Sequence, residues 1–193
     1  MEIQKGTILT EVHYSEDRQH RYLIYKEWDS SLKKATVIML NPSLADAVKM
    51  DMTTMYIINN ISELGYGSVE IVNIFSKLHE EITSDLMIEL LTNEMNDKMI
   101  LTSVARTDIT ILAWGKAGET NKQVKQRIIQ VKKLIKEHDN KLYEICDERG
   151  RKGWHPLSPS VRNGWTLLKV AGSQKEENKI VKVKPKKAEK EPD

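Results

Sequence analysis

Short apolar runs alternate with longer amphipathic segments along most of this 193-residue chain, and this alternation constrains its fold more than any other feature. Residues 8–14 and 21–28 alternate apolar and polar positions around a polar turn, which predicts an N-terminal β-hairpin. Short apolar runs predict further strands at 36–40, 69–72, 108–113 and 141–146. Helical periodicity predicts helices at 52–64, 84–104 and 120–138.

This order of elements predicts an α/β fold, a three-layer sandwich with a mainly parallel central sheet and the N-terminal β-hairpin. Residues 1–172 are expected to form this single α/β domain. Residues 173–193 contain no aromatic side chain and little apolar surface, so they bury too little to offset the entropy of ordering. We expect a disordered charged tail there, which serves solubility or acts as a phosphate-binding arm.

Composition and charge exclude several classes of protein. No apolar run approaches the ~20 residues that cross a bilayer, and the first residues lack the pattern of a signal peptide. The single cysteine, Cys146, excludes an internal disulfide and favours a reducing, cytoplasmic location. The tail accounts for the whole net charge of +2. Nucleic-acid binding by the neutral body therefore requires a local basic patch.

Each predicted core strand runs into polar or aromatic residues. Asn41 follows the first of these strands and Asn73 follows the second. Trp114 follows the third, and His155 comes after a short basic loop that follows the fourth. Ligands of open α/β sheets bind beyond the carboxyl ends of the strands, so this clustering predicts a ligand site. Taken singly, each residue also has a structural interpretation as a turn former, cap, core or loop residue.

The usual signatures of cofactor and metal sites are absent from the sequence. The histidines have no partner spacing typical of a metal site, and neither a P-loop nor a dinucleotide-binding fingerprint occurs. A Gly-x-Ser-x-Gly nucleophile turn is also missing. Cys146 lies inside a predicted strand, where we expect a core residue rather than a nucleophile. We therefore expect no cofactor and no metal.

Four short motifs resemble the signature of an uncharacterised bacterial and phage domain family. The resemblance covers roughly residues 20–160 and carries no function of its own. The motifs are Asn41-Pro42-Ser43, Asp51-x-Thr53, Trp114-Gly115 and His155-Pro156-Leu157.

The same strand ends resemble, more distantly, the motifs of the uracil-DNA glycosylase superfamily. The Asn-Pro step at Asn41 is similar to the first motif of its mismatch-specific and single-strand-selective branches, and Asn73 to the strand-ending asparagine that reads the uracil edge. Residues 111–115 resemble the apolar-Trp-Gly strand, and His155 begins a loop similar to the one with the catalytic histidine. The resemblance implies a parallel sheet between helices. This chain has asparagine where the classical enzymes carry an activating aspartate, and Leu157 where their last motif has serine.

The resemblance implies roles for four residues near the bond that breaks. Asn41 would position the attacking water through its amide oxygen. Asp46 or Asp51 would supply negative charge near the sugar, or would deprotonate the water. His155 would donate a hydrogen bond to the departing base.

It also implies contacts to the base and to the DNA. Asn73 would pair with the Watson–Crick edge of a flipped pyrimidine. Phe75 or Tyr66 would stack on the base, and Trp114 would lie beside it. Leu157 would enter the vacated base stack as a wedge. The basic residues near this loop, which would clamp phosphates unless they form an ordinary solvated loop, are Arg149, Arg151, Lys152 and Arg162.

The resulting hypothesis is a DNA glycosylase-like enzyme that flips out and excises an altered or modified pyrimidine, with duplex or single-stranded DNA as its partner and no membrane. The family resemblance suggests a modified phage base as the substrate. This hypothesis requires Asn41, Asn73 and His155 to line one pocket. Two others stay open: a hydrolase of free nucleosides or nucleotides, and a non-catalytic module that binds nucleic acid or protein.

Overall fold

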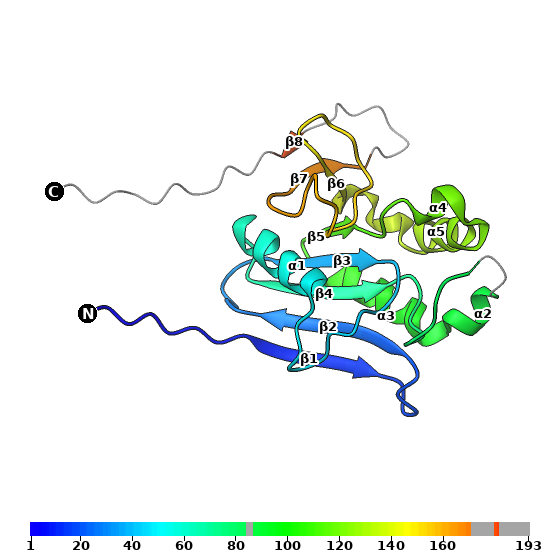
Figure 1. Cartoon of the computed structure of the whole chain (residues 1–193), viewed down its shortest axis with the longest axis horizontal. Coiled ribbons are helices and arrows are strands. Elements are labelled where there is room, and N and C mark those ends of the chain that lie inside the picture. The colour runs from blue at the N-terminus through cyan, green and yellow to red at the C-terminus, as the bar shows by residue number, and fades with distance from the viewer. Residues whose placement is uncertain (84–86, 171–179, 182–193) are drawn as a thin grey trace.

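The computed structural model describes residues 1–83, 87–170 and 180–181. Its strands form one mixed β-sheet in the order β1-β2-β4-β3-β5-β6-β7-β8 (Figure 1). The strands are β1 Leu9–Tyr14, β2 Arg21–Glu27, β3 Lys34–Met39, β4 Ser68–Asn73, β5 Ile109–Leu112, β6 Leu142–Cys146, β7 Thr166–Lys169 and β8 Ile180–Val181. The helices are α1 Met52–Glu63, α2 Ile88–Leu91, α3 Glu94–Arg106, α4 Ala117–Thr120, α5 Lys122–Leu134 and the 3-10 helix η1 Lys136–Lys141.

The sheet is parallel only at its centre. Strands β4, β3, β5 and β6 pair in parallel, whereas β1, β2, β7 and β8 pair antiparallel with their neighbours. The predicted N-terminal hairpin is confirmed as β1 and β2, and its second strand runs opposite to β4. The described sheet is therefore mixed and not mainly parallel as predicted, because the hairpin at one edge and the strands that follow β6 at the other edge pair antiparallel.

Helices cover both faces of the sheet and bury two separate apolar clusters. Val37 of β3 packs with Ile57 of α1 in one cluster. Its neighbour Ile38 points to the opposite face and packs in the second cluster with Ile100 of α3 and Val131 of α5. Figure 1 shows α1 in front of the sheet and α3 behind it. Continuous apolar strands such as β3 are expected where a sheet is covered on both sides.

The helices are more broken than the sequence pattern predicts. Of the predicted helix 84–104, residues 84–86 lie outside the described part of the chain, and the rest divides into α2 and α3. Asn93 separates the two because its side chain accepts a hydrogen bond from the Asn96 backbone N–H at 3.0 Å and caps α3. The predicted helix 120–138 corresponds to α5. This helix follows the short α4 and ends at Leu134.

The carboxyl-terminal part adds an element that the pattern did not predict. Strand β7 pairs antiparallel with β6 and buries Leu167 in the cluster on the α1 face. Only residues 180–181 of the predicted tail 173–193 are described. Among the helices that the structure describes, none is long and apolar enough to cross a membrane.

Candidate functional site

A pocket of about 230 Å³ lies beyond the carboxyl ends of β3 and β4, and we call it the strand-end pocket. Three predicted site residues meet there: Asn41 after β3, Asn73 at the end of β4, and His155 from the loop that follows β6. The full lining is Arg21, Met39, Asn41, Pro42, Ser43, Thr53, Thr54, Ile57, Ile71, Asn73 and His155.

Parallel register brings the first two of these residues together. Met39 pairs with Asn73 at the end of the β3–β4 ladder. The pairing continues past the strands, because the Ile74 backbone N–H donates to the Met39 carbonyl at 2.9 Å and the Phe75 N–H to the Leu40 carbonyl at 3.0 Å. The two chain segments therefore leave the sheet side by side, with Asn41 and Asn73 at the same edge.

A glycine lets the histidine loop approach the end of β5. Gly115 has a backbone φ of +71°, a conformation that residues other than glycine rarely adopt. A Cβ atom at this position would lie 3.2 Å from the His155 Cβ, closer than ordinary van der Waals contact. The Trp-Gly motif thus has a physical role, which is to leave space for His155.

The His155 ring is held in one tautomer. Its Nδ1 accepts a hydrogen bond from the Leu157 backbone N–H at 3.1 Å, so in the neutral ring Nε2 carries the proton. Burial lowers the pKa of His155 below 6.5, and the negative charge of Asp51 only partly opposes this. Near neutral pH the imidazole is therefore uncharged and offers one N–H donor.

The backbone at the end of β4 is held by two side-chain hydrogen bonds, whereas the Asn73 amide is not used among the described residues. Asn73 is 2% exposed. The Asn96 Nδ2 donates to its backbone carbonyl at 3.0 Å, and the Arg127 Nε donates to the next carbonyl, that of Ile74, at 2.8 Å. The side-chain amide of Asn73 has no hydrogen-bond partner among the described residues, so it can both donate to and accept from a ligand.

The two predicted carboxylates are engaged in local structure. Asp51 caps α1 by accepting from the Thr54 N–H at 2.7 Å. Burial alone would raise the pKa of Asp51, but hydrogen bonds from Ser43 and Thr54 and the charge of Arg21 hold it below 3.8. Asp46 accepts from two backbone N–H groups, those of Lys49 and Val48, which lower its pKa. Neither carboxylate is among the residues that line the strand-end pocket, and Asp46 lines a neighbouring hollow instead.

The structure does not bring the three predicted aromatic residues into the strand-end pocket. Phe75 and Trp114 are 1% and 8% exposed and pack in the cluster on the α3 face. Tyr66 lies just before β4, at the amino end of that strand, and packs against the cluster on the other face. A tyrosine that precedes a parallel strand lies at the edge of the sheet opposite to the strand-end pocket.

The predicted DNA-binding residues follow β6, and half of the basic ones are already paired. Arg151 forms an ion pair with Asp147 at 2.7 Å, and Lys152 pairs with Glu144 at 3.4 Å. By contrast, Arg149 and Arg162 are exposed without an ion pair in the described part of the chain. Leu157, the predicted wedge, is also exposed (36%).

Arg21 lines the strand-end pocket and was not predicted as a site residue. Tyr14 of β1 pairs with Arg21 although its neighbour His13 pairs with Leu23, so Tyr22 is an extra residue. Such a bulge reverses the alternation of side chains beyond it. Arg21 therefore joins Ile57 on the α1 face rather than following Leu23 to the α3 face. Only a bulge signal in the sequence would have revealed this, and none is evident there.

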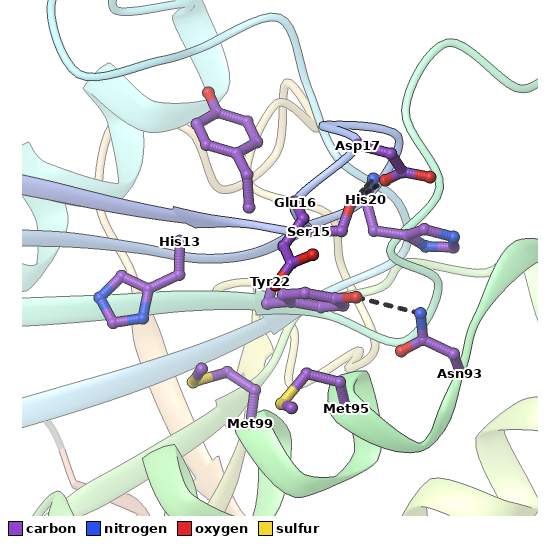
Figure 2. A pocket seen from close by; sticks show the side chains of 10 residues that line it. His13, Ser15, Glu16, Asp17, His20, Tyr22, Asn93, Met95 and Met99 are labelled. Carbon is purple, nitrogen blue, oxygen red and sulfur yellow. Dashed lines mark hydrogen bonds between the residues drawn. The ribbon is translucent and has the colours of Figure 1, made fainter.

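A larger hollow of about 710 Å³ lies between the β1–β2 turn and α3, and we call it the hairpin hollow (Figure 2). The Asn93 Nδ2 donates to the Tyr22 hydroxyl at 3.0 Å, and the His20 Nδ1 lies 2.9 Å from the Ser76 hydroxyl. Asp17 accepts from the Ser15 hydroxyl at 2.6 Å. The polar groups of this hollow are thus largely satisfied within the protein.

In the described ranges, no group of three His, Cys, Asp or Glu side chains is placed to hold a metal ion.

Comparison with known proteins supports one assignment. No curated protein and no solved structure matches the chain. Residues 21–157 match the family described as "Protein of unknown function (DUF1643)", and this range contains every strand from β2 to β6 and every residue of the strand-end pocket. The chain therefore belongs to the DUF1643 family.

Proposed function

We propose that this chain is a DNA glycosylase that flips an altered or modified pyrimidine into the strand-end pocket and hydrolyses its N-glycosidic bond. The observation that carries the proposal is that Asn41, Asn73 and His155, which follow β3, end β4 and follow β6, line one pocket. The pocket lies where ligands of open α/β sheets usually bind, beyond the carboxyl ends of parallel strands.

The size and polarity of the pocket favour a single base. Its volume of about 230 Å³ is below the roughly 300–1,000 Å³ of pockets for drug-sized ligands. The unpartnered amide of Asn73 offers the adjacent donor and acceptor that the Watson–Crick edge of a pyrimidine requires. The Asn96 bond fixes the backbone from which this amide projects.

In the proposed reaction, Asn41 and Asp51 act on the sugar side of the bond that breaks, and His155 acts on the base side. Water adds through its oxygen to C1′ of the sugar, and the electron pair of the C1′–N bond leaves with the base. Asn41 positions the water, and the proton that the water loses passes to the base or to solvent. The Nε2–H of His155 donates to the departing base, and the ionised, half-buried Asp51 favours positive charge on the sugar.

The surroundings of the pocket offer contacts to DNA. Leu157 follows His155 by two residues and is exposed, as a wedge into the base stack must be. Arg149 and Arg162 keep their charges available for phosphate oxygens. Arg151 and Lys152 would first have to release their carboxylate partners. We therefore assign the phosphate contacts to Arg149 and Arg162.

A uracil-DNA glycosylase-like fold, a three-layer sandwich, is part of this proposal. Four parallel central strands with helices on both faces support it. The asparagine at position 41 in place of an aspartate supports a catalyst that positions water without deprotonating it.

The test is strand scission on defined DNA. Duplex and single-stranded oligonucleotides with uracil, hydroxymethyluracil, thymine or modified cytosines are incubated with the full chain and then treated with alkali. Scission at one base, lost in Asn41→Ala and His155→Ala, is the expected result. DNA binding without scission on any substrate would instead support a non-catalytic binding module. Absence of both would direct the search to free nucleosides and nucleotides.

A further inference from the structure

Arg21 is an unusual member of the strand-end pocket because it is a charged side chain in its wall that is almost fully buried. It is 2% exposed and begins β2, where the bulge at Tyr22 directs it to the α1 face. A buried charge is costly unless it is paired and hydrogen-bonded. The partners of this guanidinium therefore indicate what it is for.

Only one of the three nitrogens of Arg21 has a hydrogen-bond partner among the residues that the structure describes. Its Nη1 donates to the carbonyls of Ser43 at 2.9 Å and of Ala45 at 2.6 Å. In the described part of the chain, Nε is buried without a partner, and both hydrogen bonds of the guanidinium use Nη1 and leave Nη2 free. Nε and Nη2 form one edge of the planar guanidinium, which is the edge that binds carboxylates and phosphates in bidentate fashion.

The charge of Arg21 is also unpaired, unlike that of the other buried arginine. Arg127 is 3% exposed, forms an ion pair with Asp97 and donates to a backbone carbonyl. Arg21 forms no ion pair with a described carboxylate. Burial lowers the pKa of Arg21 to about 10, and the nearby Tyr14 and Asp51 only partly oppose this. Asp51 is already occupied as the cap of α1.

We propose that Arg21 is an anion-binding residue, whose free edge receives negative charge that the ligand of the strand-end pocket carries or acquires. This inference rests on the proposed function for the source of the charge. When the C1′–N bond breaks, its electron pair stays on the base and spreads to the ring carbonyl oxygens. Arg21 then donates to one of these oxygens, while His155 donates to the same leaving base from another loop. A phosphate group of a free nucleotide is the other source of such an anion.

Binding of small probes tests this inference without DNA. Nitrogen-15-labelled full chain is titrated with barbiturate, a pyrimidine that is ionised near neutral pH, with uracil, which has a similar ring but is neutral, and with inorganic phosphate. Amide shifts at Ser43, Thr54 and Leu157 locate the binding, and the side-chain Nε–H signal of Arg21 reports directly on the free edge. We expect barbiturate to bind roughly 10- to 100-fold more tightly than uracil, as a charge-assisted hydrogen bond predicts.

Matched variants separate the anion site from a structural role. Arg21→Met removes the charge, and we expect it to abolish the preference for barbiturate over uracil. Arg106→Met removes a guanidinium that pairs with Glu70 outside the strand-end pocket, and it is expected to leave that preference unchanged. Because Arg21 also tethers the Ser43–Ala45 segment, both variants are checked by thermal melting. If Arg21→Met does not fold, Arg21→Lys is the second variant, and the probe preference and Nε–H shift of the wild-type chain still decide the question.

Each outcome has a defined meaning. A barbiturate preference that depends on Arg21 supports the inference, even when no DNA substrate is cleaved. A preference for phosphate that depends on Arg21 supports the anion site but identifies a phosphate as its ligand, which counts against the glycosylase proposal. Equal binding of barbiturate and uracil with an unshifted Nε–H signal, or no binding of any probe, would overturn the inference and leave Arg21 as a loop tether.

Discussion

The strand-end pocket and the hairpin hollow differ in both size and chemistry. The hollow is about 710 Å³ and the pocket about 230 Å³. In the hollow, the Tyr22 hydroxyl, the His20 ring and the Asp17 carboxylate all have partners within the protein. In the pocket, the buried Nε of Arg21 has no partner among the described residues.

This difference shows why volume alone is a poor guide to a functional site. Paired polar groups stabilise the fold, and a ligand gains little from them because it must first break their bonds. Unpaired buried groups cost folding free energy, so their retention at a concave site indicates a ligand that satisfies them. Figure 2 shows the opposite case, in which Tyr22 and Asn93 hold the hairpin against the helix that carries Met95 and Met99.

The largest expected effect is on catalysis. His155→Ala and Asn41→Ala are each expected to lower the excision rate by roughly 10²–10³-fold, because each removes a group that acts on the transition state. Tyr22→Phe, the matched change in the hairpin hollow, is expected to leave the rate within about twofold and to cost about 1 kcal/mol of stability. Single-turnover excision rates and urea unfolding measure the two effects. A rate loss in Tyr22→Phe equal to that in His155→Ala would remove the distinction between the two regions.

The next effect is on the free energy of unfolding, through the hydrogen bond by which Asn96 holds the backbone of Asn73. Asn96→Asp places a carboxylate oxygen against the carbonyls that the Asn96 Nδ2 now binds, and it is expected to lower the free energy of unfolding by about 1–3 kcal/mol. Asn93→Asp is its control, because aspartate also caps a helix well and the Tyr22 hydroxyl can donate to it. The control is expected to change stability by less than about 0.5 kcal/mol. Urea unfolding curves of the two variants decide the point, and equal losses would contradict it.

The two regions also show what sequence reasoning could and could not predict. Asn41, Asn73 and His155 were grouped because they follow strands, and parallel pairing brings strand ends together whatever the details of packing. Arg21 is not predictable as a site residue, because a one-residue bulge moves its side chain to the other face of the sheet and no particular residue type marks such a bulge in the sequence. Tyr66 was placed beside the base because its residue type fits stacking, whereas its position before a strand puts it at the wrong edge.

Local capping limited the predictions in a similar way. Asp51 has the chemistry of a general base, but in the structure its carboxylate accepts a hydrogen bond as the cap of α1, so we assign it only an electrostatic role. The break between α2 and α3 depends on the cap formed by Asn93, which an apolar periodicity does not reveal. Strand β7 is short and pairs with β6, 20 or more positions earlier in the chain, so it depends on a long-range contact.

A smaller effect concerns the space that Gly115 provides for His155. Gly115→Ala is expected to cost about 1–2 kcal/mol, because alanine is strained at positive φ, and to lower activity because the new Cβ displaces the His155 loop. Gly150 has a similar φ of +74°, but a Cβ atom there would meet nothing within 4 Å. Gly150→Ala should therefore show the stability loss without the loss of activity. If the two variants have the same activity, the glycine has no special role at the site.

The smallest effect is on the pH dependence of stability. Burial is the main cause that lowers the pKa of both His155 and His20 below 6.5. The unfolded chain therefore binds protons first as the pH falls, so stability is full above about pH 6.5 and is lost as the pH falls through the lower pKa of the folded chain. His155→Gln and His20→Gln should each flatten this dependence in chemical denaturation between about pH 7.5 and 5.5. Only His155→Gln should also change the pH profile of activity; a change in both profiles would contradict the comparison.

The most direct test of the central claim is the release of a free base. The full chain is incubated with DNA that carries candidate modified pyrimidines, and the low-molecular-weight fraction is analysed by mass spectrometry. The account predicts that one free pyrimidine is released by the wild-type chain and by Tyr22→Phe, but not by Asn41→Ala or Asn73→Ala. Release that continues in the two pocket variants, or DNA that is bound and recovered with every base intact, would contradict it.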